Sequence, residues 1–194
     1  MKALLLVLLV PLSAFSATPW PGNLTVLSRV EAESIYREIS HNSEIPYAFP
    51  DGCHAKAQKI ALLLDEKNIV SGKAFVEGSI FHNEPGWGDQ LWLFHVAPVV
   101  LVESLHQPEP FIIDPFLAKK LVTFSEWRDL LAKDHRTKLG RTFFTNRFVY
   151  DPPHALENPV EYNLSYIQDM ELMFKQMWER LKNRSKVLRQ KLSR

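Results

Sequence analysis

Cysteine is nearly absent from this chain of 194 residues, which contains only Cys53. A single cysteine cannot form an internal disulfide, and the seven histidines are scattered without the spacing of metal ligands. We therefore expect no metal and no cofactor. The formal net charge of +1 gives no general electrostatic reason to bind nucleic acid.

Long hydrophobic runs are also missing. The most apolar stretch, residues 3–12, is too short to span a bilayer; it follows Lys2 and precedes small residues. This pattern predicts a signal peptide over residues 1–17, and a retained membrane anchor is the weaker alternative. No cysteine stands at the cleavage site, which excludes a lipoprotein. We expect a secreted or periplasmic protein with no stable membrane anchor after cleavage.

Acidic residues are absent beyond Glu179, where seven basic residues lie. A solvated helical tail is the simpler interpretation of this segment, and contact with an anionic surface or partner is the alternative. The remaining chain is 46% hydrophobic and rich in aromatic residues, so it can bury a core without disulfides. We expect one domain over residues 18–194 that ends in a long basic helix.

Hydrophobic periodicity and capping residues predict an α+β domain. Capping boxes at Ser28/Glu31 and Thr123/Glu126 each open a helix. The expected helices cover residues 29–40, 53–67, 124–133 and 162–192. The expected strands cover residues 73–81, 91–102 and 111–114, with a further strand or extended segment over 142–150. The loop at residues 83–89 is expected at the rim of a cleft.

Cys53 follows a Pro-Asp-Gly turn and begins the second of these helices. The free N–H groups and the positive dipole end of a helix favour a thiolate, so this position indicates a reactive thiol. Asp51 is a plausible N-cap whose carboxylate would oppose this effect. The next residue, His54, is expected to point away from the thiol because successive helical residues differ by about 100°.

A thiolate nucleophile needs a base, and the base needs an orienting acceptor. His95 lies inside a buried apolar strand, where an imidazole is costly unless its nitrogens are paired. Asp114 ends the next apolar run. If the two runs form an antiparallel hairpin, residues 95 and 114 lie opposite each other on one face. The sequence therefore indicates a Cys53, His95 and Asp114 triad.

Three segments carry a resemblance to a known family: IPYAFPDGCHAKA (residues 45–57), FHVAPVV (94–100) and IIDPFL (112–117). In this order they resemble the bacterial protein-glutaminase family. The resemblance implies a transglutaminase-like (papain-like) fold, in which the helix bearing the cysteine packs on a small antiparallel sheet bearing the histidine and the aspartate. It also implies deamidation of protein-bound glutamine to glutamate, with release of ammonia through a thioester on Cys53.

The substrates implied are proteins or peptides that carry glutamine, and Tyr47, Phe49, Trp87 and Trp92 are candidate substrate contacts. A thiol endopeptidase or a transglutaminase would use the same triad, so spacing alone leaves those activities open. A third alternative is a non-catalytic exported binding protein that buries Cys53 and uses its basic C-terminal helix to engage a partner.

Overall fold

A mainly antiparallel sheet and four α-helices make up the part of the chain that the computed structural model describes, residues 23–192. The elements are, in chain order, β1 (Val26–Leu27), α1 (Arg29–Ser40), α2 (Cys53–Glu66), β2 (Gly72–Glu84), β3 (Gly88–Val102), β4 (Glu109–Ile112), β5 (Val122–Thr123), α3 (Phe124–Leu131), β6 (Lys138–Asn146), a 3-10 turn (His154–Glu157) and α4 (Leu164–Leu192). The predicted α+β class is confirmed.

The sheet has the strand order β5-β4-β3-β2-β6, and neighbouring strands on this path are antiparallel. The short strand β1 pairs in parallel with the end of β3. On the side of β3 opposite β2, β4 pairs only from Val99 onward. Among the described strands, none therefore covers that edge of β3 before Val99. The N-terminus of α2 approaches there, because the Cys53 Sγ lies 4.0 Å from the carbonyl oxygen of Phe94.

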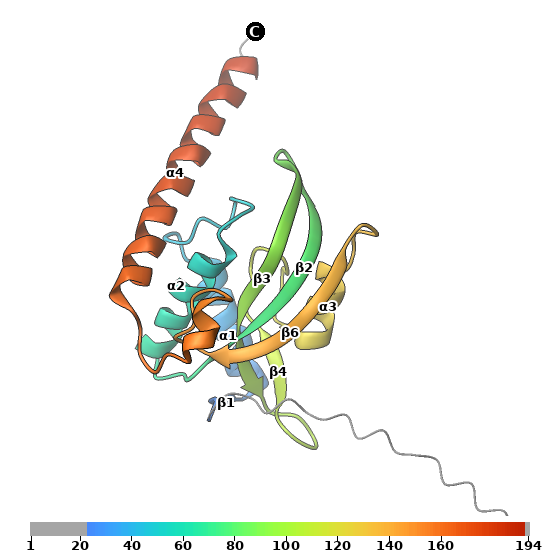
Figure 1. Cartoon of the computed structure of the whole chain (residues 1–194), viewed down its shortest axis with the longest axis vertical. Coiled ribbons are helices and arrows are strands. Elements are labelled where there is room, and N and C mark those ends of the chain that lie inside the picture. The colour runs from blue at the N-terminus through green and yellow to red at the C-terminus, as the bar shows by residue number, and fades with distance from the viewer. Residues whose placement is uncertain (1–22, 193–194) are drawn as a thin grey trace, which may run out of the picture.

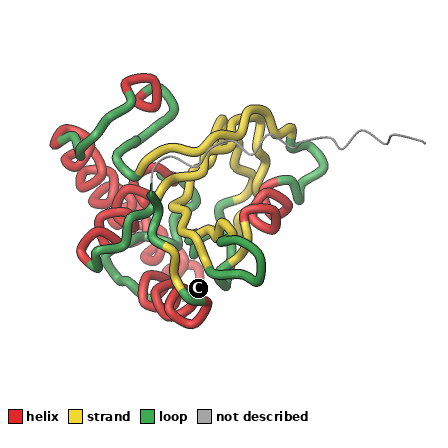
Figure 2. The backbone as a smooth tube through the Cα atoms, turned by 90° about the horizontal axis from the view of Figure 1, so that it is seen from below, coloured by secondary structure: helices red, strands yellow, loops and turns green. Residues whose placement is uncertain are grey.

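Helices cover both faces of the sheet, but unequally (Figure 1). One buried cluster joins α1, α2 and α4 to β3 and β4 through side chains such as Ile39, Leu64 and Val100. A second cluster joins Trp127 and Leu131 of α3 to the opposite face. Figure 2 shows this arrangement from another side, with most of the helices beside the strands on one side and a short helix on the other.

Both predicted capping boxes are present. The Ser28 and Thr123 side chains accept hydrogen bonds from the backbone N–H groups of Glu31 and Glu126, and each glutamate bonds back to the cap residue. The helices α1, α2 and α4 begin and end within about two residues of the predicted bounds. These boundaries depend on local hydrogen bonds, which explains why the sequence located them.

The strands differ more from the predictions. The loop predicted at residues 83–89 is mostly strand, because β2 and β3 form a long hairpin that pairs Glu84 with Gly88. The last strand is β6, which ends at Asn146, earlier than predicted, and the strands β1 and β5 were not predicted. Two-residue strands exist only through their partners, so periodicity does not reveal them.

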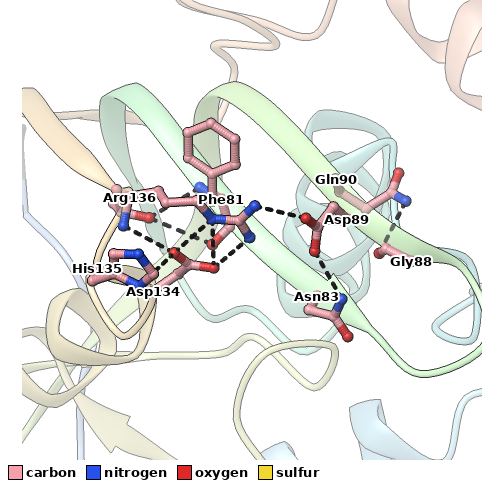
Figure 3. A network of polar contacts seen from close by, with 9 residues as sticks. Phe81, Asn83, Gly88, Asp89, Gln90, Asp134, His135 and Arg136 are labelled. Carbon is pink, nitrogen blue, oxygen red and sulfur yellow. Dashed lines mark hydrogen bonds and ion pairs between the residues drawn. The ribbon is translucent and has the colours of Figure 1, made fainter.

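The β2–β3 hairpin is tied to the loop before β6 by a network of charged groups (Figure 3). Arg136 bonds to both Asp134 and Asp89, with Nη1 to Oδ2 of Asp89 at 2.6 Å. Asn83 of β2 donates to the same Asp89. These partly exposed contacts join the start of β3 to β2 and to the loop before β6. The buried residues described below lie further along β3.

None of the described helices is long and apolar enough to cross a membrane. The predicted signal peptide, residues 1–17, lies outside the described residues.

Candidate active site

Cys53 is the first residue of α2, and its side chain is half-buried. Gly52 caps the helix in a left-handed conformation (φ 73°), and no side chain of the described residues caps this end. The Asp51 carboxylate accepts a hydrogen bond from the Gly52 N–H at 2.7 Å instead. The expectation that Asp51 is the N-cap is therefore wrong, because the cap falls one residue later. The first N–H groups of α2 remain free to face an anion.

His95 and Asp114 form a buried pair, with 2.7 Å between Nε2 of the histidine and Oδ2 of the aspartate. The contact was predicted, but the predicted register was wrong. Val99 pairs with Ile112, so the same register extended would place Asp114 opposite Ala97. A shift of two residues keeps a side chain on the same face of the sheet. Asp114 also follows the end of β4, where the backbone leaves the ladder.

Two further donors hold the Asp114 carboxylate. The indole N–H of Trp127, on α3, donates to Oδ2 at 2.9 Å, and the Leu117 N–H donates to Oδ1 at 3.3 Å. Burial raises the pKa of Asp114, but the charge of His95 and these bonds outweigh burial and lower it overall. The aspartate is therefore held as a carboxylate that fixes the imidazole.

The ring of His95 presents its other nitrogen, Nδ1, to the interior. This atom is buried and has no hydrogen-bond partner among the described residues. Burial lowers the pKa of His95, but Asp114, followed by the Cys53 thiol, raises it to about 10. Because Nε2 is hydrogen-bonded to Asp114, Nδ1 is the nitrogen that can exchange a proton with Cys53. A flat stack of Trp92 on the imidazole, 5.0 Å between ring centroids, further fixes the ring.

The thiol of Cys53 is acidic in this setting. Burial raises its pKa, but the rings of His54 and His95 outweigh burial and lower the pKa to about 6. A thiol with this pKa is mostly thiolate at neutral pH. The helix-end placement predicted from the sequence is thus supplemented by two imidazoles.

The expectation that His54 points away from the thiol is wrong. Its ring lines the same cavity as Cys53 and lies edge-on to Tyr150, with 4.9 Å between centroids. Its Nε2 is 3.2 Å from Sδ of Met173, on α4. A rotation of about 100° separates two side chains in mid-helix, but in the first turn both can flank one opening. The packing of α4 and Tyr150 decides where this ring lies.

These residues surround one cavity of about 250 Å³. Of the four candidate substrate contacts, Tyr47 and Trp92 line it. Phe49 and Trp87 do not: they pack edge-to-face against each other, 5.0 Å between centroids. The guanidinium of Arg184, on α4, lies over Trp87 at 4.2 Å. The helix α4, which is distant in sequence, therefore packs against Trp87, and the assignment of these two rings as substrate contacts stays a prediction.

Sequence reasoning missed two contributors to the site. Trp127 was counted only as part of a helix, and its bond to Asp114 depends on how α3 docks. Lys56 lines the cavity one turn after Cys53. The spacing of three residues places both on one side of α2, which was a usable signal. The part of the chain that the structure describes contains no group of side chains that could hold a metal ion. The expected absence of a metal stays a prediction.

Chemically, the arrangement combines an acidic thiol, a buried imidazole and a carboxylate that orients it. This is the set of groups that covalent acyl transfer to sulfur requires: a nucleophile, a proton carrier and an orienting anion. The free N–H groups at the start of α2 lie beside the thiol, where an oxyanion would form.

A family model described as glutaminase matches residues 30–131, which include all three residues of the predicted triad. Among solved structures, the chain is similar to the NMR structure of protein-glutaminase from Chryseobacterium proteolyticum, with 24% identity over 77% of this chain and 87% of that one, at a TM-score of 0.64. A crystal structure of protein-glutaminase gives 23% identity over 78% and 87% of the two chains, also at 0.64.

A crystal structure of pro-protein-glutaminase matches at a TM-score of 0.65, with 22% identity over 77% of this chain and 57% of that one. These structures show that the chain has their transglutaminase-like fold, as the sequence resemblance implied. No curated protein matches the chain in a sequence comparison.

Proposed function

The chain belongs to the glutaminase family, and on that basis we propose that it is a protein-glutamine glutaminase, which converts glutamine side chains of proteins to glutamate and releases ammonia. Family membership supports a hydrolase that acts on glutamine amides. The further step, to glutamine within proteins, is supported by the fold shared with structures described as protein-glutaminase.

One observation carries the proposal most directly. The acidic thiol of Cys53 shares a cavity with the buried His95–Asp114 pair, and Nδ1 of His95 has no other partner among the described residues. A buried imidazole nitrogen without a partner costs free energy unless a thiol or a reacting group uses it. We assign Cys53 as the nucleophile, His95 as the proton carrier and Asp114 as the group that orients His95.

In the first half-reaction, the Cys53 thiolate attacks the amide carbon of glutamine, and a C–S bond forms while the carbonyl electron pair moves to oxygen. The first N–H groups of α2 stabilise this oxyanion. The protonated His95 gives its proton to the amide nitrogen, and the C–N bond breaks. Ammonia leaves, and the acyl group remains on Cys53 as a thioester.

In the second half-reaction, neutral His95 takes a proton from water, and the resulting hydroxide attacks the thioester. The C–S bond breaks, glutamate is released, and the thiolate and the protonated imidazole are restored. Asp114 keeps Nε2 bonded throughout, so the ring presents Nδ1 to both reactions.

The test is ammonia release by purified mature chain from a glutamine-rich protein, with free glutamine as a second substrate. Cys53→Ala and His95→Ala are expected to abolish the release, and Asp114→Ala to impair it severely. Because triad members act as a unit, losses in double variants should not add. The matched controls are His106→Ala and Asp129→Ala, both exposed, which should behave like the wild type.

Four results would contradict this proposal. Substantial ammonia release by Cys53→Ala would exclude Cys53 as the nucleophile. Cleavage of the substrate chain would indicate a thiol endopeptidase, and incorporation of an added amine without net deamidation would indicate a transglutaminase. Release from free glutamine alone would keep the family chemistry but remove the protein substrate.

We further propose that the enzyme is exported, with residues 1–17 removed as a signal peptide, and that it acts outside the cytoplasm without a stable membrane anchor. The basis is the pattern of Lys2, a short apolar run and small residues. N-terminal sequencing of the protein recovered from the periplasm or medium of a bacterial host tests this. An intact Met1 on the recovered protein would contradict it.

A further inference from the structure

Lys56 is a buried cation in the proposed catalytic cavity. It lies one turn after Cys53 on α2, has 5% of its surface exposed, and lines the same cavity as Cys53, His95 and Asp114. Lysine is among the residues least often buried, because removing an ammonium group from water costs free energy unless a counter-ion or hydrogen bonds replace the water.

The partners of Lys56 only partly offset this cost. Its Nζ donates to the carbonyl oxygen of Phe49 and lies 4.6 Å from the centroid of the Phe116 ring. An ammonium group has three N–H donors, and the described residues provide an acceptor for one of them. No carboxylate of the described residues lies within ion-pair distance of this nitrogen, whereas Lys59, one turn further along α2, pairs with Glu44 at 2.6 Å.

The charges around Lys56 favour its protonated form. Burial lowers its pKa to about 8, and the negative groups Cys53, Asp114, Asp51 and Glu84 act in the opposite direction, with Cys53 the largest of them. The group is therefore mostly charged at neutral pH. The cavity thus holds a cation without a bonded counter-ion, and the sulfur that carries negative charge in a thiol reaction lines the same cavity.

We propose that Lys56 is a further residue of the reaction, whose ammonium group stabilises negative charge on the Cys53 sulfur and on the oxygen of the acyl group bound to it. Its effect on the thiolate can be measured in the folded protein without substrate and does not depend on the proposed function. Its effect on the acyl oxyanion and on the product carboxylate rests on the proposed function. In both roles the cation supplements the N–H groups at the start of α2, because fixed charge in a site with little water acts strongly on developing charge.

A purely structural role is the alternative, since Lys56 also ties the carbonyl of Phe49 to α2. Lys56→Gln separates the two roles because glutamine keeps an N–H donor for this carbonyl and removes the charge. Lys56→Arg keeps the charge. Lys59→Met is the matched control, because it removes a lysine from the same helix whose charge is already paired.

The first measurement is the rate of Cys53 alkylation by iodoacetamide as a function of pH, in the free protein. Lys56→Gln should raise the midpoint by about one pH unit. Lys56→Arg and Lys59→Met should stay close to the wild type. The second measurement is ammonia release from protein-bound glutamine, where Lys56→Gln should lower kcat about tenfold or more with a smaller change in KM. The thermal unfolding midpoint of each variant shows whether it is folded.

An alkylation midpoint and a kcat for Lys56→Gln equal to those of the wild type would overturn the proposal and leave Lys56 as a structural tie. If Lys56→Gln does not fold, Lys56→Met with the same alkylation assay and Lys56→Arg as its charged counterpart decide the matter. Absence of ammonia release from the wild type would overturn the proposed function, while the alkylation midpoint would still decide the effect of Lys56 on the thiolate.

Discussion

Two histidines from different elements act on the single thiol of this protein. His54 follows Cys53 on α2, and His95 comes from β3, where Asp114 bonds its far nitrogen. Both lower the pKa of the thiol against the effect of burial. The sequence pattern favours His95 as the partner of the thiol, because His95 lies in an apolar strand. In the structure His54 lines the same cavity, so two imidazoles lower the pKa of the thiol.

We expect His95→Ala and His54→Phe each to raise the pKa of Cys53 from its value of about 6, and the double variant to raise it further. The reason is that each variant removes a neighbouring imidazole whose positive charge favours the thiolate. The measurement is the pH dependence of iodoacetamide alkylation, with His106→Ala as an exposed control. An unchanged profile in His95→Ala would mean that His95 and the thiol do not interact in solution.

Lys73 gives a second prediction for a single residue. It is fully buried, and its Nζ donates to the Gln58 side chain and the Val149 carbonyl. Burial lowers its pKa from 10.5 to about 7. Between these values the unfolded chain binds a proton that the folded protein does not. The contribution of Lys73 to the free energy of unfolding therefore increases as the pH rises from about 7 to 10.5. This increase is lost again as the pH falls toward about 7.

We compare the wild type with Lys73→Met by urea unfolding at several pH values. The stability of Lys73→Met relative to the wild type should be greatest near pH 7 and should decline as the pH rises to about 10. Using this difference cancels the contributions of the other titrating groups, including Cys53 and His95. A difference that is independent of pH would show that Lys73 is protonated equally in the folded and unfolded states.

At the scale of elements, the site is assembled from residues of three elements that are separated in the sequence. The helix α2 carries the thiol, β3 carries the imidazole, and the turn after β4 carries the carboxylate. The helix α3, on the opposite face of the sheet, reaches this carboxylate through the indole of Trp127. The sheet is therefore the common support, and both layers of helices contribute to the site.

Trp127→Phe should lower kcat for ammonia release about tenfold with a small loss of stability. Phenylalanine keeps most of the buried surface but cannot donate to Asp114, and a hydrogen bond to a charged group is worth about 1.5–3 kcal/mol. Steady-state kinetics and urea unfolding measure the two effects. Phe124→Leu is the control within α3, because Phe124 contacts the Trp127 ring and its side chain has no donor for Asp114. Equal losses of kcat in both variants would contradict a specific role for the indole.

At the scale of the whole molecule, α4 holds together segments that lie far apart in the sequence (Figure 1). Met177 is buried against Gly52, the cap of α2, and Met173 contacts His54. Further along the same helix, Arg184 lies over Trp87, at the tip of the β2–β3 hairpin. The last turns of the helix extend beyond the sheet, whereas Met173 and Met177 in its first half support the start of α2.

Met177→Ala should destabilise the protein by about 2–4 kcal/mol, because methionine truncation in a core leaves a cavity. It should also lower ammonia release, since the backbone before Cys53 loses its support. Urea unfolding and activity assays measure the two effects. Leu188→Ala, on the exposed part of the same helix, should change stability by no more than about 0.5 kcal/mol. Equal effects of the two substitutions would contradict the supporting role of α4.

The sequence by itself determined the features that depend on neighbouring residues. Capping boxes located α1 and α3, the Pro-Asp-Gly turn located the start of α2, and an apolar strand singled out His95. These signals are local, because a cap or a periodic face is formed within a few residues. The family resemblance added the fold and the expected deamidation of glutamine, and the family is confirmed.

Only the tertiary structure decided how these elements meet. It placed Asp114 two residues away from the predicted register, turned His54 toward the thiol, and packed Trp87 against Arg184 of α4. Each of these results depends on contacts between segments far apart in the chain, and no local pattern encodes such distances. The same holds for Lys56. Its residue type predicts a solvated surface, whereas its buried position in the cavity depends on its contacts with Phe49 and Phe116.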